Sequence, residues 1–277
     1  MTGDLIRIFS DIHYGDLSSR VRSLTQLAPL FDDADVVLLN GDTLDTRHGP
    51  HPGRTAELRQ EAADFLSRRA PQAVLMTGNH DPDISRLHTQ TLGDGRVWVT
   101  HGDVLFDDIV PWGRDVPLIR RLLAAEHAGH RGPDAASLED RLAVFRRVCA
   151  QIPQRHQAEP NRWKHLLGFA RDTFWPPHHA GQVIRAWRVA PGKAAALARV
   201  HRPAAQFVVV GHTHRPGIWP TRDRRVIINT GSFTRPFGAR LVELTPGRLR
   251  VRRIEARGGA FHPGRVLAEF ALAEAGA

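Results

Sequence analysis

The stretch LIRIFSDIHYGD, residues 5–16, decides the fold class. Its apolar run from Leu5 to Phe9 has the length and the branched side chains of a buried strand. The run ends abruptly in Asp11-Ile12-His13, and residues two apart on extended backbone point the same way, so both side chains can contact one ion. The stretch therefore predicts a buried strand with a metal-binding pair at its carboxyl end.

The same pattern recurs further along the chain. Short apolar runs lie at residues 36–39, 73–76, 97–99 and 207–210. The polar clusters that follow them are Gly41-Asp42, Gly78-Asn79-His80-Asp81, His101-Gly102-Asp103 and Gly211-His212-Thr213-His214. Loops converge at the carboxyl ends of strands in α/β sheets, and the sheet holds them rigidly. We therefore expect all these clusters to meet in one site.

Helical periodicity separates the first strands, over residues 21–30 and 55–69. Two late runs, 241–244 and 249–254, alternate with charged residues on either side of Thr245-Pro246-Gly247 and predict a β-hairpin. Strands and helices of this kind predict an α/β protein with mixed sheets.

Residues 107–203 contain no comparable strand run and are rich in Ala, Arg, His and Trp. We interpret them as an inserted helical lid, with one helix opening at Ser137 and a second over 161–174. The catalytic domain then comprises residues 1–106 and 204–277. We expect its two sheets to hold the site without help from the insert.

The composition is that of a globular protein, with 42% hydrophobic and 24% charged residues. A single cysteine, Cys149, excludes a disulfide framework and a Cys-based zinc cluster. No apolar stretch approaches the ~20 residues of a membrane span, and the amino-terminus does not read as a signal peptide, so we expect a cytoplasmic protein.

The net charge of +9 is uneven, at −5 for residues 1–106, +7 for 107–203 and +7 for 204–277. This asymmetry fits a site that holds cations and receives an anion. A general bias toward Arg, which supplies 36 of the 38 basic residues, explains it equally well.

The ordered series Asp-x-His, Gly-Asp-x-x-Asp, Gly-Asn-His-Asp, His-Gly-Asp and Gly-His-x-His resembles the signature of the calcineurin-like metallophosphoesterases. The resemblance covers residues 5–106 and 207–244 and implies a two-sheet αββα sandwich with a dinuclear metal centre. It implies one metal held by Asp11, His13, Asp42 and His214, and a second held by Asp42, Asn79, His101 and His212. Asp42 would bridge the two.

Carboxylate, amide and imidazole donors suit Mn²⁺, Fe or Zn²⁺, and we expect two divalent ions with Mn²⁺ foremost. Two such ions activate a water as hydroxide and neutralise phosphate oxygens, which predicts hydrolysis of a phosphodiester or diphosphate. His80 abuts Asn79 and is the candidate proton donor to the leaving group. Asp45 is expected to hydrogen-bond His80 and hold it protonated, with a helix cap as the alternative.

The position of the insert is similar to that in bacterial UDP-2,3-diacylglucosamine pyrophosphatases. This resemblance implies a lipid-linked diphosphate substrate and peripheral contact with the inner membrane through the basic lid. Its apolar lining would come from Trp112, Trp163, Phe169, Phe174, Trp175 and Trp187. Its anion contacts would come from Arg120, Arg121, Arg146 and Arg147. That subgroup carries Arg where this sequence has His80, the general family pattern.

Other interpretations remain open. The insert needs a core of its own, which explains its aromatic residues without a lipid. A nucleotide or nucleic-acid phosphodiesterase would also use a basic surface, but aromatic and basic residues are not interleaved here, so nucleic acid is not favoured. A non-catalytic scaffold of the same fold should have lost ligands, and this sequence retains all seven.

Overall fold

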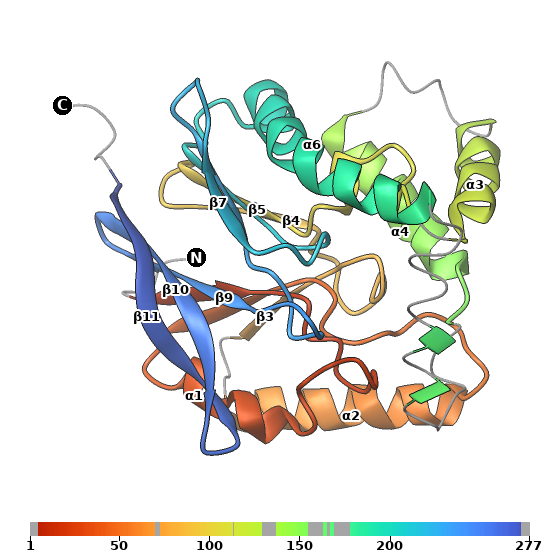
Figure 1. Ribbon diagram of the computed structural model, residues 1–277, viewed down its shortest axis with the longest axis horizontal. Coiled ribbons are helices and arrows are strands. Elements are labelled where there is room, and N and C mark those ends of the chain that lie inside the picture. The colour runs from red at the N-terminus through yellow and green to blue at the C-terminus, as the bar shows by residue number, and fades with distance from the viewer. Residues whose placement is uncertain are drawn as a thin grey trace.

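The computed structural model describes residues 5–69, 73–112, 114–128, 137–154, 163–164, 167–168 and 178–272. In these residues two β-sheets pack face to face, and helices cover their outer faces (Figure 1). This arrangement confirms the predicted αββα sandwich.

The first sheet has six strands in the order β11-β10-β9-β1-β2-β3. They are β1 (Ile6–Phe9), β2 (Val36–Asn40), β3 (Ala73–Met76), β9 (Arg240–Thr245), β10 (Arg248–Arg257) and β11 (Ala260–Ala271). β1 pairs in parallel with β2 and antiparallel with β9. The predicted hairpin is β9 and β10, in which Thr245 pairs with Arg248.

The second sheet has five strands in the order β4-β5-β6-β8-β7. They are β4 (Thr89–Leu92), β5 (Val97–Thr100), β6 (Phe207–Val210), β7 (Gly217–Pro220) and β8 (Val226–Asn229). β6 lies parallel to both β5 and β8. β4, β7 and β11 were not among the predicted strands.

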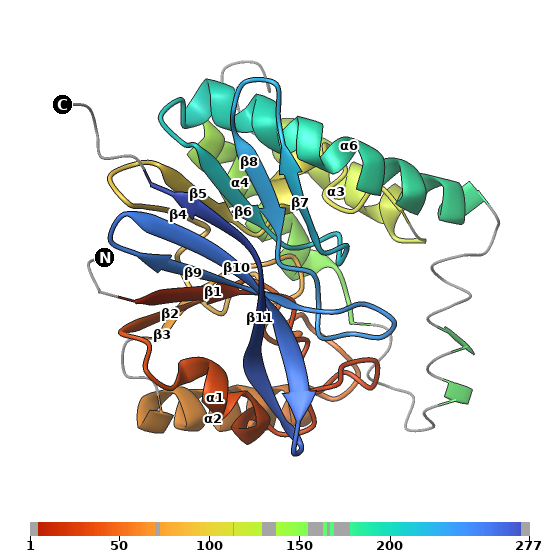
Figure 2. The ribbon, with the colours of Figure 1, turned by 60° about the vertical axis from the view of Figure 1, so that its left-hand side comes forward.

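The helices divide between the two outer faces, as Figure 2 shows. They are α1 (Ala28–Phe31), α2 (Pro52–Arg69), α3 (Val116–Ala128), α4 (Leu138–Gln151) and α6 (His178–His201), with 3₁₀ turns at Leu24–Leu27 and Asp103–Leu105. α1 and α2 lie beneath the first sheet, whereas α4 and α6 cover the second.

Three apolar clusters hold these layers together. The first packs α1 and α2 on the first sheet, the second fills the space between the sheets, and the third packs α6 on the second sheet. In the middle cluster Ile8 and Leu38 meet Val99 and Val209. All four side chains are fully buried, so the strand ends that carry the polar clusters have rigid support.

One predicted helix differs from expectation and another is not tested. Residues 21–30 form a 3₁₀ turn followed by α1, because Pro29 lacks the amide that a continuous helix needs there. The predicted helix over 161–174 lies largely outside the described residues. The expected cap is present, since the Ser137 side chain accepts from the Asp140 amide and α4 begins at Leu138.

Candidate metal centre

All seven predicted ligands lie in loops that directly follow a strand, and the fold brings them together. They are Asp11 and His13 after β1, Asp42 after β2, Asn79 after β3, His101 after β5, and His212 and His214 after β6. His214 is partly exposed and the other six are buried. The expected convergence of the strand ends is therefore what the structure shows.

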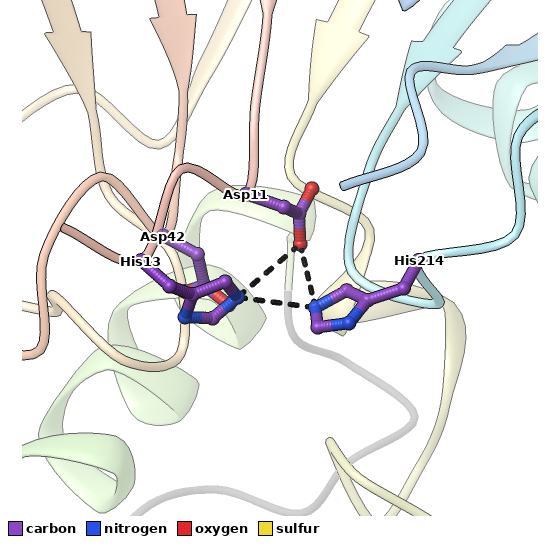
Figure 3. Close-up of side chains that lie close together, drawn as sticks. All are labelled: Asp11, His13, Asp42 and His214. Carbon is purple, nitrogen blue, oxygen red and sulfur yellow. Dashed lines mark hydrogen bonds and ion pairs between the residues drawn. The ribbon is translucent and has the colours of Figure 1, made fainter. Parts of the chain in front are cut away.

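A first group joins the two sheets through Asp11, His13, Asp42 and His214, each of which offers one donor atom within 4.8 Å of the others. Figure 3 shows these side chains pointing toward one another from the loops that follow β1, β2 and β6. The Nε2 atom of His214 lies 3.1 Å from Asp11 Oδ1 and 3.1 Å from His13 Nε2. His13 Nε2 lies 3.7 Å from Asp42 Oδ2.

A second group adjoins the first at Asp42. His101 Nε2 lies 3.3 Å from Asp42 Oδ2 and 3.2 Å from Asn79 Oδ1. His212 Nδ1 lies 2.7 Å from the same Asn79 oxygen. Asp42 Oδ2 thus faces a histidine of each group, which is the position that a bridging carboxylate requires.

The backbone at five of the ligands is left-handed. Asp11, His13, Asp42, His212 and His214 have φ between 48° and 64°. Aspartate and histidine are among the few residues besides glycine and asparagine that tolerate this region. A left-handed residue turns the chain sharply as it leaves the strand, so the loop can present its donor back over the sheet edge.

Glycine at position 78 permits a close approach between two of the loops. A Cβ there would lie 2.5 Å from the Asp42 backbone nitrogen and would also collide with the Asp42 carboxylate. Gly41 has φ of +81°, and a Cβ on it would lie 2.5 Å from Nδ1 of His101. A side chain at either position would therefore force the neighbouring groups apart.

Hydrogen bonds from behind orient three of the ligand histidines. His101 Nδ1 lies 2.9 Å from the Asn40 carbonyl, and His212 Nε2 lies 3.0 Å from the Ile109 carbonyl. His214 Nδ1 lies 3.3 Å from Thr234 Oγ1. A carbonyl oxygen can only accept a hydrogen bond, so the nitrogen of His101 or His212 that faces the carbonyl carries the proton. The other ring nitrogen then directs its lone pair into the site.

The pKa values fit a pocket built for cations. Burial lowers the pKa of His13 and of His212 to about 4, so both rings are neutral ligands at pH 7. Burial opposes the charge of Asp42, but His101, His80 and His13 outweigh it and hold the pKa of Asp42 well below its usual range. Burial also lowers the pKa of His101, yet Asp42 raises it well above its usual value.

Asp81 anchors the loops rather than facing the ligands. Its carboxylate accepts from the backbone amides of Gly78, Asp42, Thr43 and Leu44, at 2.7 to 3.3 Å. Burial and the nearby Asp42 carboxylate raise the pKa of Asp81 to about 7. This carboxyl therefore ties the loop after β2 to the loop after β3.

His80 lies beside the first group, with its ring 4.9 Å from that of His13, and its amide donates to Asp42 Oδ1. The expected contact with Asp45 is present, since Asp45 Oδ2 lies 3.1 Å from His80 Nδ1. Arg47, which was not among the predicted site residues, forms a two-point ion pair with Asp45 and lies 2.8 Å from the same His80 nitrogen. Asp45 and Arg47 therefore compete for Nδ1 of His80.

The insert contacts the ligand loops at several points. Gln154 donates to the Asp45 carbonyl at 2.5 Å, and Arg146 donates to the Pro82 carbonyl at 2.6 Å. Trp187 donates to the Thr213 carbonyl, between the two histidines that follow β6. With the Ile109 carbonyl on His212, these contacts make the insert part of the site's support. These contacts bear on the expectation that the two sheets hold the site without the insert, which stays a prediction.

Three of the four arginines expected to face substrate in the insert have partners within the protein, and the fourth, Arg121, is exposed. Arg120 pairs with Asp108, Arg147 pairs with Glu126, and Arg146 bonds Pro82 as above. Among the expected lining residues, Trp112 packs on the ring of His212 and Trp187 on Phe237. Trp163 is exposed, whereas Phe169, Phe174 and Trp175 lie outside the described residues.

Divalent metals fit this donor set. The carboxylates of Asp11 and Asp42 contact imidazole rings and backbone amides. Within the described part of the chain, neither forms an ion pair with Lys or Arg. Two buried carboxylates crowded by imidazoles at about hydrogen-bond distance form a site that a hard or borderline cation stabilises.

A comparison with protein families agrees with this geometry. The profile of the calcineurin-like phosphoesterases matches residues 5–216, which include every ligand loop described above. The chain belongs to the calcineurin-like phosphoesterase family. A comparison with the curated proteins finds no match.

Solved structures with similar folds include other phosphoesterases. One is a conserved uncharacterized protein from Streptococcus pneumoniae TIGR4, described as a predicted phosphoesterase, with 17% identity, a TM-score of 0.43 and coverage of 98% of this chain and 99% of that one. A dimetal phosphatase from Danio rerio has 13% identity, a TM-score of 0.45 and coverage of 90% and 95%. Vps29 from Entamoeba histolytica, complexed with Zn²⁺, has 14% identity, a TM-score of 0.42 and coverage of 96% and 98%. Separately, none of the described helices has both the length and the apolar character that a membrane crossing demands.

Proposed function

We propose that this protein hydrolyses a phosphodiester or a diphosphate with two divalent metal ions, of which manganese is the first choice. The observation that carries the proposal is the pair of donor groups that meet at Asp42 Oδ2. Asp11, His13, Asp42 and His214 would hold one ion, and Asp42, Asn79, His101 and His212 the other. When bound, such ions supply a hydroxide at neutral pH and neutralise phosphate oxygens.

His80 is the proposed proton donor to the leaving group. Its Nδ1 faces Asp45 and Arg47, whereas its Nε2 makes no hydrogen bond to any described residue, which leaves Nε2 to carry the proton toward substrate. Burial and the positive charge of Arg47 lower the pKa of His80. The carboxylates of Asp42 and Asp45 raise it and outweigh these effects, so the pKa of His80 lies above its usual value. Arg47 also fixes Asp45 by a two-point ion pair, and so positions the carboxylate that faces His80.

A lipid-linked diphosphate is the narrower proposal for the substrate, with peripheral membrane contact through the insert. One observation favours it, namely that Trp112 and Trp187 of the insert lie beside His212 and Phe237 and give this side of the site an apolar border. Burial of an acyl chain in such a border contributes about 0.8 kcal/mol per CH₂.

The test is metal analysis of the purified protein combined with a substrate panel. The panel contains a phosphomonoester, bis(p-nitrophenyl) phosphate, a nucleotide-linked lipid diphosphate with its deacylated form, and short DNA. We expect about two Mn²⁺ per chain and Mn²⁺-dependent hydrolysis of the diester or the diphosphate. A metal-loaded protein that cleaves nothing on the panel would instead be a scaffold. Equal rates on acylated and deacylated diphosphate would refute the lipid proposal alone.

A further inference from the structure

Four arginines lie near one end of strands β9 and β10 in the first sheet. Arg240 on β9 and Arg253 on β10 are direct cross-strand partners. Arg20 and Arg235 lie on two loops that backbone hydrogen bonds join, from the Arg20 amide to the Phe233 carbonyl and from the Arg235 amide to the Ser18 carbonyl. Burial and the charges of Arg235 and Arg253 lower the pKa of Arg20, so these three side chains share one region, and Arg240 lies opposite Arg253 on the neighbouring strand. We call these four residues the arginine cluster.

The arginine cluster adjoins the metal centre. Ile8 of β1 pairs with Val242, so Arg240, two residues earlier on β9, lies at the end of β1 that leads to Asp11. The loop that carries Arg235 also contacts two ligand residues. Its Thr234 lies 3.3 Å from His214 Nδ1, and its Ser232 donates to the Asp11 carbonyl.

No carboxylate pairs with the arginine cluster within the described part of the chain, although the Arg20 guanidinium lies over the Phe261 ring, 5.5 Å from its centroid. None of its members forms an ion pair there, although Arg20 and Arg240 are half-buried. Other arginines on β10 are paired, Arg250 and Arg248 with Glu269 and Arg252 with Glu243. The arginine cluster therefore differs from its neighbours on β10 in having no carboxylate partner among the described residues.

We propose that the arginine cluster binds a second phosphate of the substrate, so that the natural substrate carries at least one phosphate besides the one that is attacked. This proposal rests on the proposed function and narrows its substrate class. Guanidinium groups match phosphate oxygens with two parallel hydrogen bonds, and several together hold a doubly charged group. Arg120, Arg146 and Arg147 of the insert contact protein groups, whereas Arg235 and Arg253 are exposed and form no ion pair with a described residue.

Two substrates that differ by one remote phosphate test this. They are p-nitrophenyl thymidine 5′-phosphate and the same compound with an added 3′-phosphate. In the native protein the added phosphate should raise kcat/KM about tenfold, mainly through KM, as expected for one charge-assisted contact. In Arg235→Gln and Arg253→Gln that gain should disappear, while activity on the substrate without the 3′-phosphate stays within about twofold. Arg248→Gln, at the far end of β10, is the matched control and should keep the gain.

A second measurement needs no turnover. Sodium sulfate should raise the Tm of the Mn²⁺-loaded native protein more than sodium chloride does at equal ionic strength, and the doubly substituted variant should lose most of that difference. If hydrolysis proceeds but neither the 3′-phosphate gain nor the sulfate shift depends on these arginines, the anion site is refuted and the hydrolase stands. If the sulfate shift depends on them but no substrate is cleaved, the anion site stands and the proposed function fails.

Discussion

Substitution of Gly78 by alanine tests how closely two ligand loops must approach. The added Cβ would lie 2.5 Å from the Asp42 backbone nitrogen, whereas ordinary contact begins at 3.4 Å. The loops after β2 and β3 must therefore separate by about 0.9 Å, the difference between these distances. Backbone cannot rotate out of the way, so the movement displaces Asp42 relative to Asn79.

The magnitude follows from this displacement. A misplacement of about 1 Å in a catalytic constellation lowers rates by roughly 10²-fold. Overpacking costs about 1–3 kcal/mol of the free energy of unfolding, and the loss of glycine flexibility in the unfolded chain offsets about 0.4–1 kcal/mol of that. We therefore expect Gly78→Ala to fold, with a modestly lower Tm, and to lose about 99% of its activity.

The assay is kcat/KM on bis(p-nitrophenyl) phosphate with Mn²⁺, together with metal content by mass spectrometry and urea unfolding. Gly192→Ala in α6 is the control, because a Cβ there has no neighbour within 4 Å. It should keep full activity and gain up to about 1 kcal/mol in stability. Native metal content with kcat/KM within threefold of the native value in Gly78→Ala would refute the reasoning.

Three further predictions concern single side chains. Asp42→Ala should remove most bound metal and nearly all activity, and a variant with two metals per chain and normal turnover would exclude Asp42 as the shared ligand. His80→Ala should retain metal and lower turnover by about 10²–10⁴ on poor leaving groups, with partial rescue by nitrophenolate; an equal loss on both kinds of ester would contradict its role. Gln154→Ala removes the buried hydrogen bond to the Asp45 carbonyl, and it should lower the free energy of unfolding by about 1–3 kcal/mol and slow turnover without metal loss. Unchanged kinetics would show that the insert does not support the His80 loop.

The convergence of the candidate ligands was predictable from sequence because each lies within four residues of the end of an apolar strand. The carboxyl ends of neighbouring parallel strands lie together at one end of a sheet, so residues that follow these strands are predicted to converge without knowledge of long-range contacts. Arg47 was not predictable in the same way. Its contact with His80 joins residues 33 positions apart, and an arginine in a polar loop reads as exposed until packing buries it.

The missed elements share a physical cause. β11 contains Pro263 and Gly264, which indicate a loop, but it is an edge strand whose register shifts accommodate both. α6 contains Pro191 and Gly192, which normally interrupt a helix, yet its alanine face is buried against the second sheet. In both segments tertiary packing outweighs the local signal.

The left-handed backbone of the ligands has a consequence for how this chain changes under mutation. Each such conformation costs a non-glycine residue about 1–2 kcal/mol, so Asp11, His13, Asp42, His212 and His214 together hold the fold below the stability it would have with glycine at those positions. Random drift under selection for a well-folded protein alone would favour glycine or asparagine there. At these five candidate ligands the fold therefore trades stability for the position of a donor atom.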